Sequence, residues 1–311
     1  ITGGSGADTI NGGAGADTLT GGAGIDTFTI GSGTDTLTDL GNGGADVLVI
    51  SAGATLNATA TAAWTATSAT ANSGTAATIA TAGFGINVAS ATGTTGWTIT
   101  GSGATAMVLT GGANADVIKG GSGADTINGG AGADTIWGGD GADTINTGAA
   151  DDNLVDVIRY AASTEYGDTV TNFDTTGTVD VVRFTDALRT DFDDVSVNGV
   201  FTWATGNSAA GTGTSAILTS VEGLYLSGVS GEGVTNALLN SASSVAAAFN
   251  TEFAISGSGD AVLVINDTDL NGFSVWHYVE AGTSEIQAAE LTLVGVFSGN
   301  GTVTTTSFTF G

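Results

Sequence analysis

An aspartate recurs every nine residues at the start of the chain, and glycines surround each one. Residues 3–11 read GGSGADTIN, residues 12–20 read GGAGADTLT and residues 21–29 read GGAGIDTFT. Carboxylate and peptide carbonyl oxygens are the ligands that Ca²⁺ prefers in proteins. Glycine, which lacks a Cβ, lets the backbone turn its carbonyls in directions that other residues resist. The spacing therefore predicts calcium binding by the turns of a repeated unit.

The nine-residue repeat has the form G-G-x-G-x-D-x-U-x, where U is a large apolar residue. The first array continues with residues 30–38 and, after two extra residues, closes with residues 41–49. A second array covers residues 111–155 and ends in a degenerate repeat, TGAADDNLV. A fixed internal period of this kind predicts a solenoid, in which each repeat packs on its neighbours.

The triplet x-U-x predicts a very short strand whose apolar residue points inward. Two repeats then make one coil of two strands and two turns, and successive coils stack at the inter-strand distance of about 4.8 Å. The predicted inward residues are Ile10, Leu19, Phe28 and Leu37 in the first array, and Ile118, Ile127, Ile136, Ile145 and Leu154 in the second.

Stacking places carboxylates one coil apart, as in the pairs Asp8/Asp26 and Asp134/Asp152. Two unit charges about 5 Å apart at an effective dielectric constant near 20 repel each other by about 3 kcal/mol. One aliphatic residue per repeat cannot compensate for that cost at every coil, whereas a divalent cation between the turns makes the interaction attractive. The predicted carboxylate ligands are Asp8, Asp17, Asp26, Asp35, Asp46, Asp116, Asp125, Asp134, Asp143 and Asp152. The glycines predicted to present the turns to the ions are Gly4, Gly6, Gly13, Gly15, Gly22, Gly24, Gly121, Gly123, Gly130, Gly132, Gly139 and Gly141.

These repeats resemble those of the RTX (repeats-in-toxin) calcium-binding family. The resemblance implies a parallel β-roll in which Ca²⁺ lies between adjacent turns, held by the sixth-position aspartate and by carbonyls of the preceding residues. It also implies export by a type I secretion system, with an uncleaved C-terminal signal, and folding outside the cell. Ile30, Asn114 and Ala150 depart from the glycine pattern. A flexible Gly/Thr/Asp-rich linker is the alternative, but a linker does not keep an aspartate and a large apolar residue at fixed positions over several nine-residue repeats.

The charge balance restricts the partners. The 31 acidic and four basic residues give a formal net charge of -27, which argues against nucleic acids and anionic membranes and favours cations. The chain contains no cysteine, so it has no disulfides and no thiolate metal site. No apolar run reaches the roughly 18 residues that a membrane span needs. Because residue 1 is not Met and falls within a repeat, we expect the chain to be the C-terminal part of a longer protein.

Composition divides the chain into residues 1–49, 50–108, 109–194 and 195–311. Thr/Ala alternation in the second region predicts strands, which form a β-rich insertion or irregular solenoid turns stacked between the arrays. A low-complexity spacer is the alternative. Its bulky anchors are Trp64, Phe84, Trp97 and Met107.

The segment after the second array resembles the one that often follows RTX arrays, and we expect it to cap the roll. The predicted core residues of this cap are Val155, Ile158, Val170, Phe173, Val182 and Phe184. Four further aspartates either hold another calcium ion or are solvated, and solvation is favoured. They are Asp156, Asp168, Asp174 and Asp180.

The last region predicts a β-rich domain with short strands, one helical run at 234–249 and a secretion-signal-like tail, TVTTTSFTF. The segment from Asp267 through Asp269 and Asn271 matches the first half of an EF-hand loop. Its twelfth position is Tyr278 instead of a bidentate glutamate. The segment is thus either a variant calcium loop or a plain hairpin turn.

No catalytic constellation is visible. His277 is the one histidine, and the chain has neither a G-x-S-x-G elbow nor an H-E-x-x-H motif. Paired carboxylates, which glycoside hydrolysis uses, are numerous, but most of them are already predicted to bind calcium. We therefore expect that the chain is not an enzyme.

The sequence as a whole favours an all-β, calcium-dependent extracellular structural protein, such as a subunit of a bacterial S-layer. Expected partners are calcium ions, further copies of the chain and cell-surface polysaccharide. Two alternatives remain: an export and folding module of a secreted RTX enzyme or toxin, and an RTX adhesin or ice-binding roll.

Overall fold

The computed structural model describes residues 1–149, 152–174, 178–184, 203–207, 223–227, 261–267, 272–278, 291–299 and 308–310. The chain divides into two compact units. The first comprises Ile1–Ala149 and Leu154–Val157, and the second comprises Ala150–Asn153 and Ile158–Gly311.

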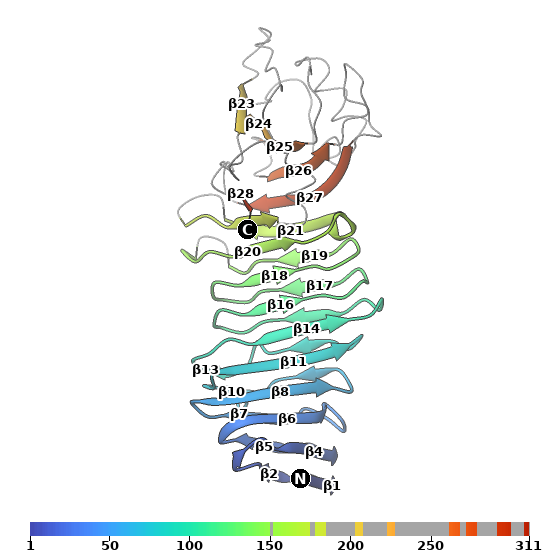
Figure 1. Ribbon diagram of the computed structural model, residues 1–311, viewed down its shortest axis with the longest axis vertical. Coiled ribbons are helices and arrows are strands. Elements are labelled where there is room, and N and C mark those ends of the chain that lie inside the picture. The colour runs from blue at the N-terminus through green and yellow to red at the C-terminus, as the bar shows by residue number, and fades with distance from the viewer. Residues whose placement is uncertain are drawn as a thin grey trace. The chain divides into compact units, whose positions relative to one another are not determined.

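The first unit is a solenoid of short parallel strands, which stack in chain order along its length (Figure 1). Its strands form three sheets. One contains, in spatial order, β1 (Thr2–Ser5), β4 (Thr18–Ala23), β6 (Ser32–Leu40), β8 (Ala54–Ala60), β11 (Ala76–Ala82), β14 (Thr98–Ser102), β16 (Val117–Lys119) and β18 (Thr135–Trp137), and the short β3 (Ala14–Gly15) also pairs with β6. Another contains β2 (Thr9–Asn11), β5 (Thr27–Ile30), β7 (Val47–Ile50), β10 (Ala71–Asn72) and β13 (Thr92–Gly93). The third contains β9 (Trp64–Thr65), β12 (Ile86–Asn87), β15 (Val108–Thr110), β17 (Thr126–Asn128) and β19 (Thr144–Asn146).

The length of a coil changes along the solenoid. In the arrays, paired residues are 18 positions apart, as Thr18 and Thr36 are. Between the arrays the pairs Thr36/Asn57 and Asn57/Thr78 lie 21 positions apart. These middle coils also contain seven-residue strands, β8 and β11, where the second array has strands of three residues. Residues 50–108 are therefore coils of the same solenoid, with more backbone pairing per coil.

One column of apolar residues runs through both arrays and the segment between them, beside the columns of the other two sheets. Strand register aligns Leu19, Leu37, Ala58, Ile79, Ile99, Ile118 and Ile136 in consecutive coils. All are nearly or fully buried. Each buried Leu or Ile stabilises the fold by about 1.5–3 kcal/mol. The two predicted array cores are thus parts of one continuous core.

Bulky residues of the middle coils complete this core, with one exception. Trp64, Trp97 and Met107 are buried, and the two indole rings lie 6.4 Å apart. Phe84, predicted as an anchor, is 37% exposed, so that prediction is wrong for this residue. It is also wrong for Leu154, which is 40% exposed because the degenerate last repeat does not form the regular coil.

The second unit contains two sheets and one short 3-10 helix, η1 (Ser163–Glu165). One sheet consists of β20 (Val157–Tyr160), β22 (Val181–Phe184) and β28 (Phe308–Phe310). The other has the order β21 (Asp168–Phe173), β27 (Leu291–Gly299), β26 (Gly272–Tyr278), β25 (Ala261–Asp267), β24 (Gly223–Ser227) and β23 (Trp203–Asn207). Strand β26 runs antiparallel to both neighbours. An aromatic cluster joins β21, β26 and β27, in which the Phe273 and Phe297 rings stack 4.7 Å apart.

The prediction of an all-β fold with parallel β-roll arrays is confirmed, and the described residues contain no α-helix. The predicted helical run at 234–249 lies outside them. Among the predicted cap residues, Val155 is half-buried and the others are buried, while the capping role itself stays a prediction. Our preference for solvated carboxylates in this segment is wrong. The four are Asp156, Asp168, Asp174 and Asp180, each no more than 4% exposed.

Candidate calcium sites

Five sixth-position aspartates reach back to the coil before them. In each of the five, the Oδ1 atom accepts a hydrogen bond from the backbone N–H of the sixth-position aspartate one coil earlier. The pairs are Asp8 N to Asp26 Oδ1 at 2.8 Å, Asp17 N to Asp35 Oδ1 at 3.0 Å, Asp26 N to Asp46 Oδ1 at 3.0 Å, Asp116 N to Asp134 Oδ1 at 2.7 Å and Asp125 N to Asp143 Oδ1 at 2.7 Å. The aspartates form ladders of like charge along the stacked turns, as the repeat spacing predicts.

The second carboxylate oxygen defines the candidate site. The Oδ2 atoms of Asp17, Asp26 and Asp35 are buried and accept no hydrogen bond. A buried carboxylate oxygen without a donor carries a large desolvation cost unless a cation compensates for it. These atoms are therefore suited to metal coordination.

Backbone carbonyls converge on the same places. A Cβ added to Gly3 would lie 2.5 Å from both Asp8 Oδ2 and the carbonyl oxygen of Gly21, so these two oxygens share the space between adjacent turns. From the opposite direction, a Cβ on Gly24 would lie 2.5 Å from the carbonyl oxygen of Gly6. A side chain at the first or fourth position would fill the space that the oxygens line. Carboxylate and carbonyl oxygens together form the donor set that suits Ca²⁺.

Positive φ angles accompany this arrangement. Ten of the predicted glycines adopt φ values between 90° and 153°, a region that disfavours residues with a Cβ. They are Gly4, Gly6, Gly13, Gly15, Gly22, Gly24, Gly130, Gly132, Gly139 and Gly141. The other two predicted glycines, Gly121 and Gly123, do not adopt positive φ.

Three predicted ligands sit in turns of another kind, where both carboxylate oxygens accept backbone hydrogen bonds. Asp46 accepts from Asp26 N at 3.0 Å and from Gly41 N at 2.8 Å. Asp116 accepts from Trp97 N and from Gly112 N, both at 2.5 Å. Asp125 accepts from Met107 N and from Gly121 N, both at 2.7 Å. Burial raises the pKa of Asp46 and Asp116 above the ordinary value, although these hydrogen bonds act in the opposite direction.

The last ligand of the second array differs from the prediction. Asp134 N donates to Asp156 Oδ1 at 2.7 Å, which gives Asp156, instead of Asp152, the position one coil after Asp134. The shift arises because the last repeat contains four extra residues before the next D-x-U triplet, Asp156-Val157-Ile158. That triplet was visible in the sequence, and it is the signal that could have identified Asp156.

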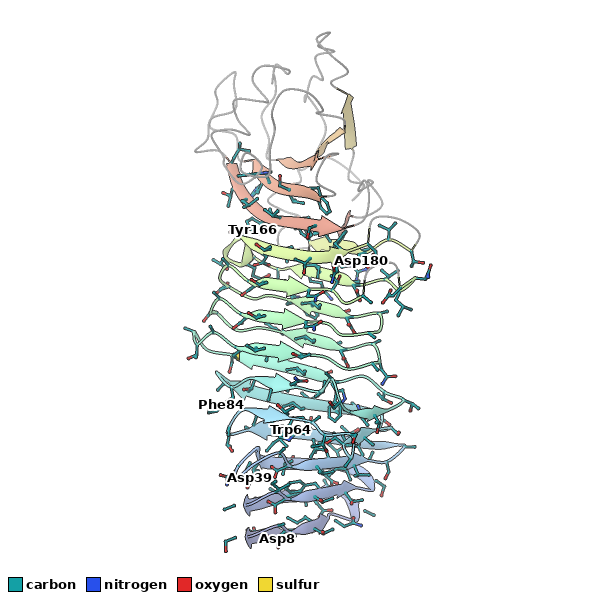
Figure 2. All side chains as sticks on the ribbon, turned by 180° about the vertical axis from the view of Figure 1, so that it is seen from behind. Asp8, Asp39, Trp64, Phe84, Tyr166 and Asp180 are labelled. Carbon is teal, nitrogen blue, oxygen red and sulfur yellow. The ribbon has the colours of Figure 1, made fainter. Side chains whose placement is uncertain are left out.

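Sequence reasoning also missed Asp39, which lies outside the repeats in the two-residue slip. Its carboxylate accepts hydrogen bonds from Gly21 N at 3.0 Å and Gly22 N at 2.8 Å. The neighbouring Asn42 donates from Nδ2 to the carbonyl oxygen of Gly22 at 2.6 Å. Figure 2 labels Asp39 further along the stack than Asp8.

The remaining predicted sites stay untested. Asp267 ends β25, and residues 268–271, including Asp269 and Asn271, lie outside the described residues. Within the described part of the chain, no three His, Cys, Asp or Glu side chains gather in one place. The candidate sites therefore depend on aspartates supplemented by backbone carbonyls.

A family model of the RTX calcium-binding nonapeptide repeat matches residues 1–37, 108–135 and 120–154. The two arrays are thus similar to RTX repeats over these segments, which make up less than half of the chain. The matched segments contain most of the turns whose aspartates stack, whereas Asp46 and Asp156 lie outside them. A search of curated proteins found no match to the chain. RTX repeats bind Ca²⁺, which supports calcium binding by these arrays, and proteins with such repeats are typically secreted.

The residues fit the ion that RTX repeats bind. Between two stacked turns, a calcium ion would supply the positive charge that the aspartate ladder needs. Asp8, Asp17, Asp26 and Asp35 would hold it in the first array, and Asp134, Asp143 and Asp156 in the second, with glycine carbonyls supplementing them. No helix among the described residues is long and apolar enough to span a membrane.

Proposed function

We propose that this chain is a secreted, non-catalytic structural protein that folds on binding Ca²⁺ outside the cell and self-associates into a surface layer of the S-layer type. The observation that carries the proposal is the buried, stacked carboxylate ladder, whose Oδ2 atoms at Asp17, Asp26 and Asp35 lack donors. Such a ladder is unfavourable at the micromolar calcium of a cytoplasm and favourable at extracellular concentrations.

A reduction of the net charge by bound calcium would favour assembly. The net charge of -27 opposes contact between copies, and each bound Ca²⁺ would reduce it by two. Calcium therefore couples two events, the ordering of the arrays and the approach of neighbouring molecules. Cell-surface polysaccharide is a further proposed partner.

The environment of His277 supports a non-catalytic role. It lies on β26, is 6% exposed, and packs edge-on against Tyr166 with the ring centroids 6.0 Å apart. A general base must reach substrate, and this imidazole instead belongs to an aromatic core.

A calcium titration of the full chain tests both parts. Far-UV circular dichroism should gain β signal as calcium rises through about 10⁻⁴–10⁻³ M, the range of extracellular calcium modules. Sedimentation velocity and negative-stain images should then show ordered assemblies that EGTA disperses. Magnesium at equal ionic strength is the control for simple charge screening.

A matched pair of variants locates the effect. Asp143→Ala removes a carboxylate of the ladder, whereas Asp140→Ala removes an exposed aspartate from the same turn. The first should raise the calcium concentration needed for folding severalfold, and the second should leave it unchanged. A chain that gains structure with calcium but stays monomeric would overturn the layer proposal and favour an export module of a secreted enzyme.

A further inference from the structure

We propose that residues 46–125 form a metal-independent section of the solenoid, in which Asp46, Asp116 and Asp125 are hydrogen-bonded caps instead of calcium ligands. Calcium then acts on two separate groups of turns, before Asp46 and after Asp125. The proposal reassigns three of the predicted ligands, and it does not depend on assembly into a layer.

The hydrogen bonds of these three aspartates carry the first step. Each carboxylate accepts one N–H from the coil before it and a second N–H from the start of its own turn, at 2.5–3.0 Å. Two backbone donors satisfy a buried carboxylate without a cation. By contrast, Oδ2 of Asp17 accepts none, although the aspartate has the same place in its repeat.

Backbone conformation distinguishes two of these three turns, those at Asp116 and Asp125, from the turns that follow them. In the turns at Asp116 and Asp125, the second-position glycines, Gly112 and Gly121, lack positive φ and donate their N–H groups to the carboxylate. In the turns at Asp134 and Asp143, Gly130 and Gly139 have φ of 107° and 99°. The sequence G-G-x-G-x-D therefore adopts two backbone conformations: its second glycine has a positive φ at Gly130 and Gly139 but not at Gly121.

The chain between the caps contains nothing for calcium to neutralise. No Asp, Glu, Lys or Arg occurs from residue 47 to residue 115. Neutral amide and indole groups connect its coils instead. Asn72 is fully buried, donates from Nδ2 to the carbonyl oxygen of Gly96 at 2.7 Å, and accepts from Gly74 N at 3.1 Å. Trp64 donates from Nε1 to the carbonyl oxygen of Asp46 at 3.0 Å.

Longer strands add further stability to this section. The pairing of β8 with β11 aligns six residue pairs, from Thr55/Ala76 to Ala60/Thr81, whereas the pairing of β16 with β18 aligns three. The packed pair Trp64 and Trp97 lies within it. A section with more backbone pairing per coil, and with no charged residue from 47 to 115, is stable without metal.

Hydrogen exchange of the full chain, followed by mass spectrometry in calcium and in EGTA, tests the inference. Peptides from 54–110 should keep their protection in EGTA, while peptides from 3–38 and 129–147 should lose at least tenfold in protection. Loss of protection in all three regions together would overturn the inference while leaving calcium-dependent folding intact. Unchanged protection everywhere would overturn both.

Variants separate a cap from a ligand. Asp116→Ala and Asn72→Ala should lower the thermal midpoint in calcium and in EGTA alike, because they remove hydrogen bonds that need no metal. Asp17→Ala should lower it in calcium only, and the exposed Asn57→Ala is the control that should change neither. An effect of Asp116→Ala that disappears in EGTA would identify Asp116 as a ligand and overturn the assignment.

Discussion

At the scale of single residues, the first glycine of each repeat is limited by its neighbours and not by backbone dihedral angles. A Cβ on Gly120 would lie 2.6 Å from Asp125 Oδ2 and would also meet the carbonyl oxygen of Gly138. Gly31 holds the second position of its repeat, after Ile30, and a Cβ there would make only an ordinary contact with the Gly13 carbonyl oxygen at 3.4 Å. Two glycines of the same motif therefore differ in their tolerance of a side chain.

This difference gives a prediction for Gly120→Ala. The added methyl group forces the two stacked turns apart, and the free energy of unfolding should fall by about 1–3 kcal/mol. Urea unfolding in calcium measures it. Gly31→Ala is the matched control and should change the free energy of unfolding by less than about 0.5 kcal/mol. Equal effects of the two substitutions would contradict the steric explanation.

At the scale of the elements, the three-residue strand is too short to be stable alone, and one inward residue connects it to the core. In β16, Ile118 is fully buried between Ile99 and Ile136, whereas its neighbour Val117 points outward and is 37% exposed. Alternation along the strand thus assigns one side chain to packing and the next to solvent.

Alanine substitutions in β16 should separate these roles. Ile118→Ala leaves a cavity in a column one residue wide and should cost about 2–5 kcal/mol of stability. Val117→Ala should cost less than about 1 kcal/mol, because the side chain that it removes is largely exposed to solvent and leaves no cavity. Thermal unfolding in calcium gives both values. Similar midpoints for the two variants would mean that the column does not carry the stability of the second array.

At the scale of the whole molecule, acidity dominates the metal-free state. The chain has 31 acidic residues, and burial raises the pKa of Asp46 and Asp116 above 3.8. A raised folded-state pKa means that the folded form binds a proton more tightly than the unfolded form. That contribution to stability is complete below the unfolded pKa and is lost as the pH rises through the folded pKa.

The protonation of these two aspartates should therefore stabilise the calcium-free chain as the pH falls through their folded-state pKa values towards 3.8. Urea midpoints measured in calcium-free buffer at several pH values check this. A urea midpoint that decreases on acidification would contradict this prediction. It would mean that the stability of the calcium-free chain depends mainly on carboxylates that stabilise the fold in their ionised form, and not on Asp46 and Asp116.

The repeats alone determined the β-roll, the inward residues and the aspartate ladders, because a nine-residue period fixes which residues share a face and a turn. Local spacing is sufficient where each coil repeats the last, as from Ile118 to Ile136. It failed at the end of the second array, where extra residues moved the ladder from Asp152 to Asp156 and left Leu154 exposed.

Only the tertiary structure decided which aspartates are suited to hold calcium and how the arrays are joined. Asp17 and Asp116 have the same place in their repeats, but the N–H of Gly112 reaches the carboxylate of Asp116, while no such donor reaches Oδ2 of Asp17. Likewise, Thr/Ala alternation in residues 50–108 left a spacer and a solenoid open. Burial of Asn72, Trp64 and Trp97 between coils decided it, because contacts between residues about 20 positions apart depend on stacking and not on local sequence.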